Sequence, residues 1–240
     1  MSIATEIERL QTAKADIKTA IEEKGVTVGD GLIDTSAEKI GKISGGDSVV
    51  KLMTNFDSAF YAKSYPKDTE LTLEYGNYFT GGISQMLRYS NGIKSIKLIG
   101  NKDVTLNIGG AFANCQDLET IDLSECSTNI TNIQYSFSGS SKLKTVKGIM
   151  NIKSGSAVVA AFSGCDNLVD VRFSLGCIEK DIDMYSSSLL SAESVQSIID
   201  GLTDLTGGTA KTLRLHSAVG TSLTDEQKAV ITAKNWTLVY

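Results

Sequence analysis

The sequence has few histidine, proline, tryptophan and cysteine residues: one, one, one and four among 240 residues. The single histidine, His216, leaves no spare member for a Ser-His-Asp triad and too few ligands for a histidine metal cluster. The cysteines have no Cys-x-x-Cys spacing, so we predict reduced thiols and no zinc site. We therefore expect a non-enzymatic protein with no metal and no cofactor.

Long apolar runs and an excess of basic charge are also missing. No stretch approaches the roughly 18 apolar residues of a membrane span, and no basic segment followed by an apolar run opens the chain. The formal net charge is −5 and the pI is about 5.0, whereas non-specific nucleic-acid binding needs a basic surface. We therefore expect no membrane insertion, no signal peptide and no nucleic-acid partner.

The chain does have an internal repeat, with a spacing of 25 residues between positions 86 and 173. Each of four segments places a large apolar residue, then Ser or Cys three positions later, and aliphatic residues three and six positions beyond that. The large apolar positions are Leu87, Phe112, Phe137 and Phe162, and the Ser/Cys positions are Ser90, Cys115, Ser140 and Cys165. A fixed period of this length is typical of repeats that stack to bury a shared core.

Each repeat ends in an alternation that predicts a short strand with one buried face. Ile96 and Leu98 are expected to point inward, as are their equivalents in the later repeats. The apolar-x-x-Ser/Cys segment ahead of each strand is spaced for a turn of helix. After position 184 the period ends, and the patterns predict helices near 191–202 and 222–233 and strands near 213–215 and 236–240.

The Ala111-Phe112-x-x-Cys115-x-x-Leu118-x-x-Ile121-x-Leu123 spacing resembles the BspA-like leucine-rich repeats, which occur in bacterial surface proteins and in phage and prophage proteins. The resemblance implies an α/β solenoid, a leucine-rich-repeat stack with a 25-residue period, preceded by a short N-terminal helical module. It also implies a recognition role without naming a ligand.

The N-terminal segment is predicted to form an amphipathic helix over residues 3–24. Its apolar positions, the candidate assembly helix, are Ile3, Ile7, Leu10, Ile17 and Ile21. Three heptads of this kind either form a short coiled coil that makes the chain a homo-oligomer or pack against the rest of the chain. The segment resembles the N-terminal module of tail-associated structural proteins of phages that infect Gram-positive bacteria, which implies attachment or oligomerisation.

These patterns divide the chain into four parts. They are an attachment or oligomerisation module (1–45), a linker with an N-terminal cap repeat (46–85), four 25-residue repeats (86–184), and an enlarged repeat with a C-terminal cap (185–240).

Outward positions of the predicted strands form a polar, mainly basic stripe. The candidate binding face comprises Lys97, Asp122, Lys147, Arg172 and Arg214, with Thr120 and Thr145 in a neighbouring column. The stripe either binds an acidic or sugar-rich polymer of a cell surface or is an ordinary solvated face whose charges alternate to avoid like neighbours.

The sequence therefore favours a non-enzymatic virion structural protein of a phage, in the tail, tail tip or fibre, made in the bacterial cytoplasm. Its expected partners are other tail or baseplate proteins, with a host cell-surface polysaccharide or protein as a further partner. The alternative is a bacterial surface adhesin of the BspA-like type, which the missing signal peptide and anchor disfavour. An enzyme would need a catalytic group of residues that the sequence does not offer.

Overall fold

A computed structural model describes residues 48–53, 61–75 and 82–240 of the chain. The chain divides into two compact units, Met1–Gly46 and Asp47–Tyr240. The predicted module at 1–45, with the candidate assembly helix Ile3, Ile7, Leu10, Ile17 and Ile21, lies outside the described residues.

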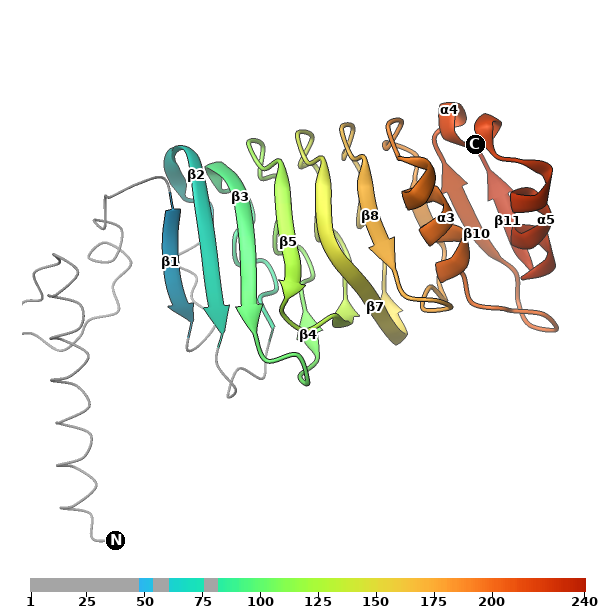
Figure 1. Ribbon diagram of the computed structural model, residues 1–240, viewed down its shortest axis with the longest axis horizontal. Helices are drawn as coiled ribbons and strands as arrows, with labels where there is room; N and C mark the ends of the chain where they lie inside the picture. Colours follow the sequence, from blue (N-terminus) through green and yellow to red (C-terminus); the bar gives the residue numbers. More distant parts are fainter. Residues whose placement is uncertain (1–47, 54–60, 76–81) are drawn as a thin grey trace, which may run out of the picture. The chain divides into compact units, whose positions relative to one another are not determined.

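The second unit is built on strands that lie side by side and run parallel (Figure 1). The main row consists of β1 (Ser48–Met53), β2 (Ser64–Tyr75), β3 (Asn91–Gly100), β5 (Thr120–Glu125), β7 (Thr145–Ala157) and β8 (Asp170–Phe173). Two short strands, β4 (Leu106–Asn107) and β6 (Asn129–Asn132), continue from the second half of β7. Together these eight strands form one sheet within the described part of the chain.

The register of the main row follows the sequence repeat. Leu71, Ile96, Ile121 and Val146 are successive partners across β2, β3, β5 and β7. All four side chains are at most 1% exposed. The predicted inward direction of Ile96 and Leu98 is confirmed, because both are buried while the residues between and around them are more exposed.

Two columns of buried side chains, at equivalent positions of successive repeats, stabilise the interior. Phe112, Phe137 and Phe162 are fully buried and stack, with ring centroids 5.8 Å and 5.2 Å apart. Beside them, Ser140 Oγ donates a hydrogen bond to the carbonyl oxygen of Phe112 at 2.7 Å, and Cys165 Sγ donates to that of Phe137 at 3.1 Å. The Ser/Cys positions therefore link each repeat to the one before it.

The C-terminal part has a separate three-stranded parallel sheet of β9 (Ile182–Met184), β10 (Lys211–Leu215) and β11 (Trp236–Val239). Three helices accompany it: α3 (Ala192–Gly201), α4 (Ser217–Ser222) and α5 (Asp225–Ala233). Side chains of Ser191, His216 and Thr224 cap their N-termini, as expected for residues that can accept a backbone N–H. The predicted helices and strands after position 184 are confirmed in type and near position.

The predicted fold class, an α/β leucine-rich-repeat solenoid, is wrong. The described chain is mostly a curled parallel β-sheet with few helices, and these helices are confined to residues 192–233. The segment ahead of each strand forms turns and not a turn of helix. Gly110 and Asn114 in one repeat, and Tyr135 and Gly139 in the next, have positive φ. Two such residues four positions apart interrupt a right-handed helix.

Candidate functional site

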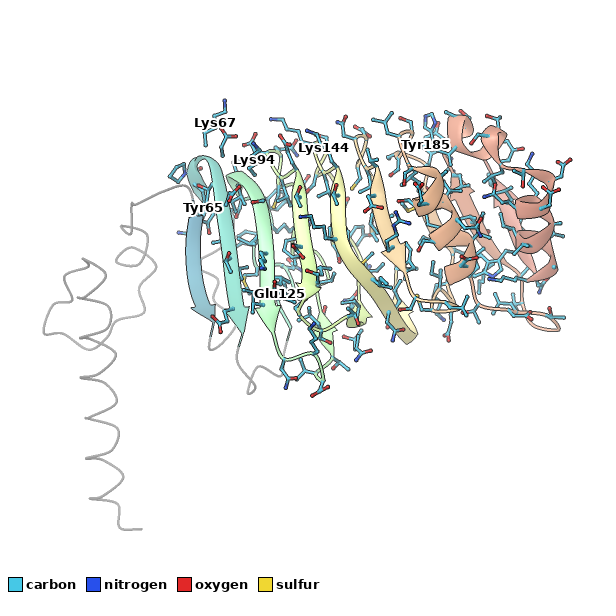
Figure 2. The ribbon with its side chains drawn as sticks, viewed as in Figure 1. Tyr65, Lys67, Lys94, Glu125, Lys144 and Tyr185 are labelled. Atoms are coloured by element: carbon cyan, nitrogen blue, oxygen red, sulfur yellow. The ribbon has the colours of Figure 1, made fainter. Side chains whose placement is uncertain are left out.

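The predicted binding face is only partly assembled in the sheet. Lys97, Asp122 and Lys147 are successive partners across β3, β5 and β7, and Thr120 pairs with Thr145. Figure 2 shows the side chains of this unit, with Lys94 and Lys144 toward one end of the strands and Glu125 toward the other.

The two arginines of the predicted stripe lie elsewhere. A register shift in β7 places Arg172 opposite Ile149 and not opposite Lys147. Arg214 belongs to the C-terminal sheet, where it pairs with Asp183. The sequence spacing could not show the displacement of Arg172, because the extra residues of a bulge inside β7 leave no clear mark on the side-chain pattern. Arg214 lies beyond the end of the 25-residue period, in a sheet separate from that of Lys97. The five charged residues therefore do not form one straight column.

The cations of the stripe have acidic partners. Lys97 Nζ lies 2.6 Å from a Glu125 carboxylate oxygen, and Lys147 Nζ lies 4.0 Å from one of Asp122. Arg172 Nε lies 2.8 Å from Asp170 Oδ1, and Arg214 Nη1 lies 3.6 Å from Asp183 Oδ2. A ligand with negative charge would have to compete with these carboxylates.

The ion pairs favour the charged forms of Lys97 and Asp122. The hydrogen bond to Glu125 is the largest of the effects that raise the pKa of Lys97, and burial opposes it. Burial acts to raise the pKa of Asp122, but hydrogen bonds from Ser124 and the nearby charges of Lys147 and Lys97 outweigh it and lower the pKa. Ion pairs this exposed contribute little to stability, and they leave the stripe nearly neutral.

Polar residues that could suggest chemistry elsewhere have structural tasks. The Nδ1 atom of His216 accepts the backbone N–H of Ala218 at 3.1 Å and so begins α4. Asp181 accepts the backbone N–H of Thr212 at 2.6 Å. Within the residues that the structure describes, no group of three or more His, Cys, Asp or Glu side chains is placed to hold a metal ion. No helix of that part is long and apolar enough to cross a membrane.

A polar cavity lies along the turns that precede β3, β5 and β7, away from the predicted stripe. Its volume is about 310 Å³, and it is lined by Ser84, Gln85, Arg88, Gly109, Gly110, Asn132, Gln134 and Tyr135. The lining contains one cation and no acidic residue. We call this cavity the turn notch.

The turn notch exists because one repeat lacks side chains that its neighbours have. In the aligned turns, Gly110 occupies the position of Gln85, Tyr135 and Ala160 in the other repeats. The prediction from sequence missed it, although two adjacent glycines in one of four aligned repeats are a visible signal. No family model, curated protein or solved structure matches the chain.

Proposed function

We propose that this chain is a non-enzymatic structural protein of a phage virion, placed in the tail, where it serves as a spacer and a recognition module. The observation that carries the proposal is the continuous interior of the second unit. Buried apolar side chains run without interruption from Leu71 in β2 to Trp236 in β11. An uninterrupted core of this kind suits a spacer, because each repeat packs against its neighbours and forms hydrogen bonds with them.

The same kinds of hydrogen bond join each repeat to the next along the stack. Backbone groups of each turn pair with those of the next, as in Leu87 N–H to Ala111 O at 2.9 Å and Phe112 N–H to Ser136 O at 2.9 Å. Hydrogen bonds from buried Ser and Cys side chains add to these pairs. Such cross-repeat bonds support a structural role, because they recur from repeat to repeat and join the repeats into one body.

The charged face also supports a structural role. Lysines just ahead of β7 pair with acids one repeat away, just ahead of β5, as in Lys144 to Glu119 at 2.8 Å and Lys142 to Asp117 at 2.8 Å. Exposed charges that neutralise one another keep a sheet face soluble without attracting a highly charged partner. The attachment part of the proposal rests on the resemblance of residues 1–45 to phage tail proteins.

The proposal is tested on particles. Antibody against the purified chain would be applied to phage particles released from the cells that encode it, and the particles viewed by electron microscopy with gold label. We expect label on the tail and recovery of the chain from purified particles by mass spectrometry. Particles free of the chain, with the protein found only on the cell surface, would support the adhesin alternative instead.

The oligomer part is tested separately by light scattering. We expect the full chain to be a trimer or larger, and a shorter chain beginning at residue 47 to be a folded monomer. If both are monomers, residues 1–46 do not assemble the chain by themselves, and the self-assembling version of the proposal is wrong.

A further inference from the structure

The turn notch is a gap in an otherwise regular row of side chains. In the aligned turns, Ser84, Gln134 and Val159 occupy the position of Gly109, and Gln85, Tyr135 and Ala160 occupy the position of Gly110. The missing side chains leave a hollow of about 310 Å³ with backbone as part of its floor. That volume is near the lower end of the range of about 300–1,000 Å³ that small-molecule sites occupy.

Gly109 and Gly110 differ in whether the structure requires a glycine at that position. A Cβ on Gly109 would lie 2.6 Å from Nδ2 of Asn132, so the close approach of that amide excludes a side chain. Gly110 has a φ of 63°, but Gln85 and Tyr135 hold the same conformation at 58° and 56° with full side chains. The backbone therefore does not require glycine at 110, and the open space there is a separate property of this repeat.

The groups around the turn notch suit a ligand with hydroxyl groups and a negative charge. Ser84 Oγ already donates to Gly109 O at 2.8 Å, and Asn132 Oδ1 already accepts the backbone N–H of Gln134 at 2.8 Å. The N–H groups of the Asn132 side chain and the side-chain amide of Gln134 can bond hydroxyl groups of a ligand, and Tyr135 presents a ring that is 43% exposed. Arg88 supplies the charge. Its Nε is buried and has no hydrogen-bond partner, and its Nη1 donates only a long bond of 3.3 Å to Gln85 Oε1.

Arg88 differs from the arginines of the predicted stripe. Arg172 and Arg214 each have a carboxylate within 4.0 Å, whereas no ion pair of Arg88 occurs among the described residues. The guanidinium lies 5.0 Å from the centre of the Tyr89 ring, a contact that positions it without neutralising it. A buried guanidinium atom without a partner is costly, and carboxylate and phosphate are the groups whose geometry matches a guanidinium best.

We propose that the turn notch binds a single anionic sugar unit of a surface polymer, with Arg88 pairing its acidic group, Gln134 and Asn132 bonding its hydroxyl groups, and Tyr135 contacting its ring. This inference rests on the proposed function, because it gives the recognition module a ligand class. The acidic group is a carboxylate or a phosphate, and both chemistries would use the guanidinium in the same way. The lining comes from three successive turns and encloses about 310 Å³, which suits one sugar unit and not a longer stretch of polymer.

Binding is measured by titration of the full-length chain with glucuronic acid, glucose 6-phosphate and uncharged glucose. We expect both charged sugars to bind with a Kd of about 1 mM, as single small contacts do, and glucose to bind at least about tenfold more weakly because it forms no charge-assisted hydrogen bond. Tighter binding of glucuronic acid assigns the site to carboxylate polymers. Tighter binding of glucose 6-phosphate assigns it to phosphate polymers.

Two variants locate the site. Arg88→Gln removes the charge, shortens the side chain and leaves only an amide in place of the five N–H donors, and we expect a loss of affinity of about tenfold to a hundredfold for the charged sugars. Gly110→Asn fills the notch with a residue that tolerates positive φ, and we expect binding to disappear. The matched control is Gly207→Asn, at φ 80° with no atom within 4 Å of an added Cβ, and it should bind as the unchanged chain does.

Three results would overturn the inference: no binding of either charged sugar at about 10 mM, tenfold above the expected Kd; equal binding of glucose; or unchanged binding by a folded Gly110→Asn chain. None of these bears on whether the chain is part of a particle. Gold label on the tail together with a failed titration would leave the proposed function standing and remove only the ligand.

Discussion

Removing the hydroxyl group of Ser140 should destabilise the fold well beyond what a surface serine would cost. Ser140 is fully buried, donates to Phe112 O at 2.7 Å and accepts from Cys115 N–H at 3.1 Å. Ser140→Ala deprives a buried donor and a buried acceptor of this partner. At roughly 1–3 kcal/mol for each group left unsatisfied, with partial relaxation, we expect a loss of about 2–4 kcal/mol in the free energy of unfolding.

Two further variants separate the hydrogen bonds from the general effect of substitution. Ser140→Cys keeps a donor, as the thiols of Cys115 and Cys165 show by donating to carbonyl oxygens 3.1 Å away in the equivalent positions. It should therefore recover about half of the loss, because thiols are weak acceptors. Ser141→Ala is the matched control. The Oγ atom of Ser141 forms a long surface hydrogen bond of 3.5 Å to Gln116 Oε1, and surface changes usually alter the free energy of unfolding by less than about 0.5 kcal/mol.

The assay is urea unfolding followed by far-UV circular dichroism, with thermal melting as a second measure. For a unit of this size, about 2–4 °C per kcal/mol converts the expected loss for Ser140→Ala into a fall of about 4–16 °C in Tm. A Ser140→Ala chain that melts within a degree or so of the Ser141→Ala chain would refute the reasoning, because it would show that the bonds between repeats contribute nothing net.

Three other perturbations follow from the same structure. Phe137→Leu removes stacking with Phe112 and Phe162. At about 0.5–1.5 kcal/mol for each ring pair, we expect a loss of at least about 1–3 kcal/mol in urea unfolding, and a loss below about 1 kcal/mol would contradict the contribution of stacking. Burial raises the pKa of Cys115 and of Cys165 from 9.0 to about 12. The folded state therefore favours the neutral thiols, and the stability that this contributes is complete below pH 9 and is lost as the pH rises from 9 to 12. Urea midpoints of unfolding should fall across that pH range, and constant midpoints would contradict the prediction. Lys234 Nζ donates to the carbonyl oxygens of Ile199, Asp200 and Leu202 at 2.9, 3.2 and 2.8 Å near the end of α3, so Lys234→Met should lower the urea midpoint by an amount that corresponds to about 1–3 kcal/mol, and an unchanged midpoint would mean that water replaces the ammonium group.

Local patterns predicted the strands well, because which face of a strand is buried can be read from residues that are close in the sequence. Alternation over a few residues identifies a strand with one buried face, and it gave the inward direction of Ile96 and Leu98 correctly. Helix signals after position 184 were equally local, since a capping residue and a following apolar pattern are both read within one turn. The Thr224 capping box is of this kind.

The fold class failed at the turns. Apolar residues spaced three positions apart fit a helical turn. The same spacing also fits consecutive tight turns when some residues of the segment have a positive φ. Gln85, Tyr135 and Ala160 hold positive φ without being glycine. No sequence pattern indicates this, because the surroundings that hold such residues come from another repeat: the N–H of Gln85 bonds Gly109 O, and the N–H of Tyr135 bonds Val159 O.

The candidate site was predicted less well than the strands, for a related reason. Spacing alone placed Lys97, Asp122 and Lys147 in neighbouring positions, and the register agrees. It could not foresee the bulge that moves Arg172, nor the acids that approach each lysine from one repeat away. Whether a charged residue is available to a ligand depends on its partners in space, and these come from other strands.

The sequence by itself therefore determined the repeat, the buried face of each strand and the residues that stack in the core, because these depend on hydrophobic periodicity. Only the tertiary structure decided that the turns are not helical, that the charged stripe is largely neutralised, and that Gly109 and Gly110 open a notch beside Arg88. Those properties arise between repeats, where a side chain's surroundings are set by residues about 25 positions away.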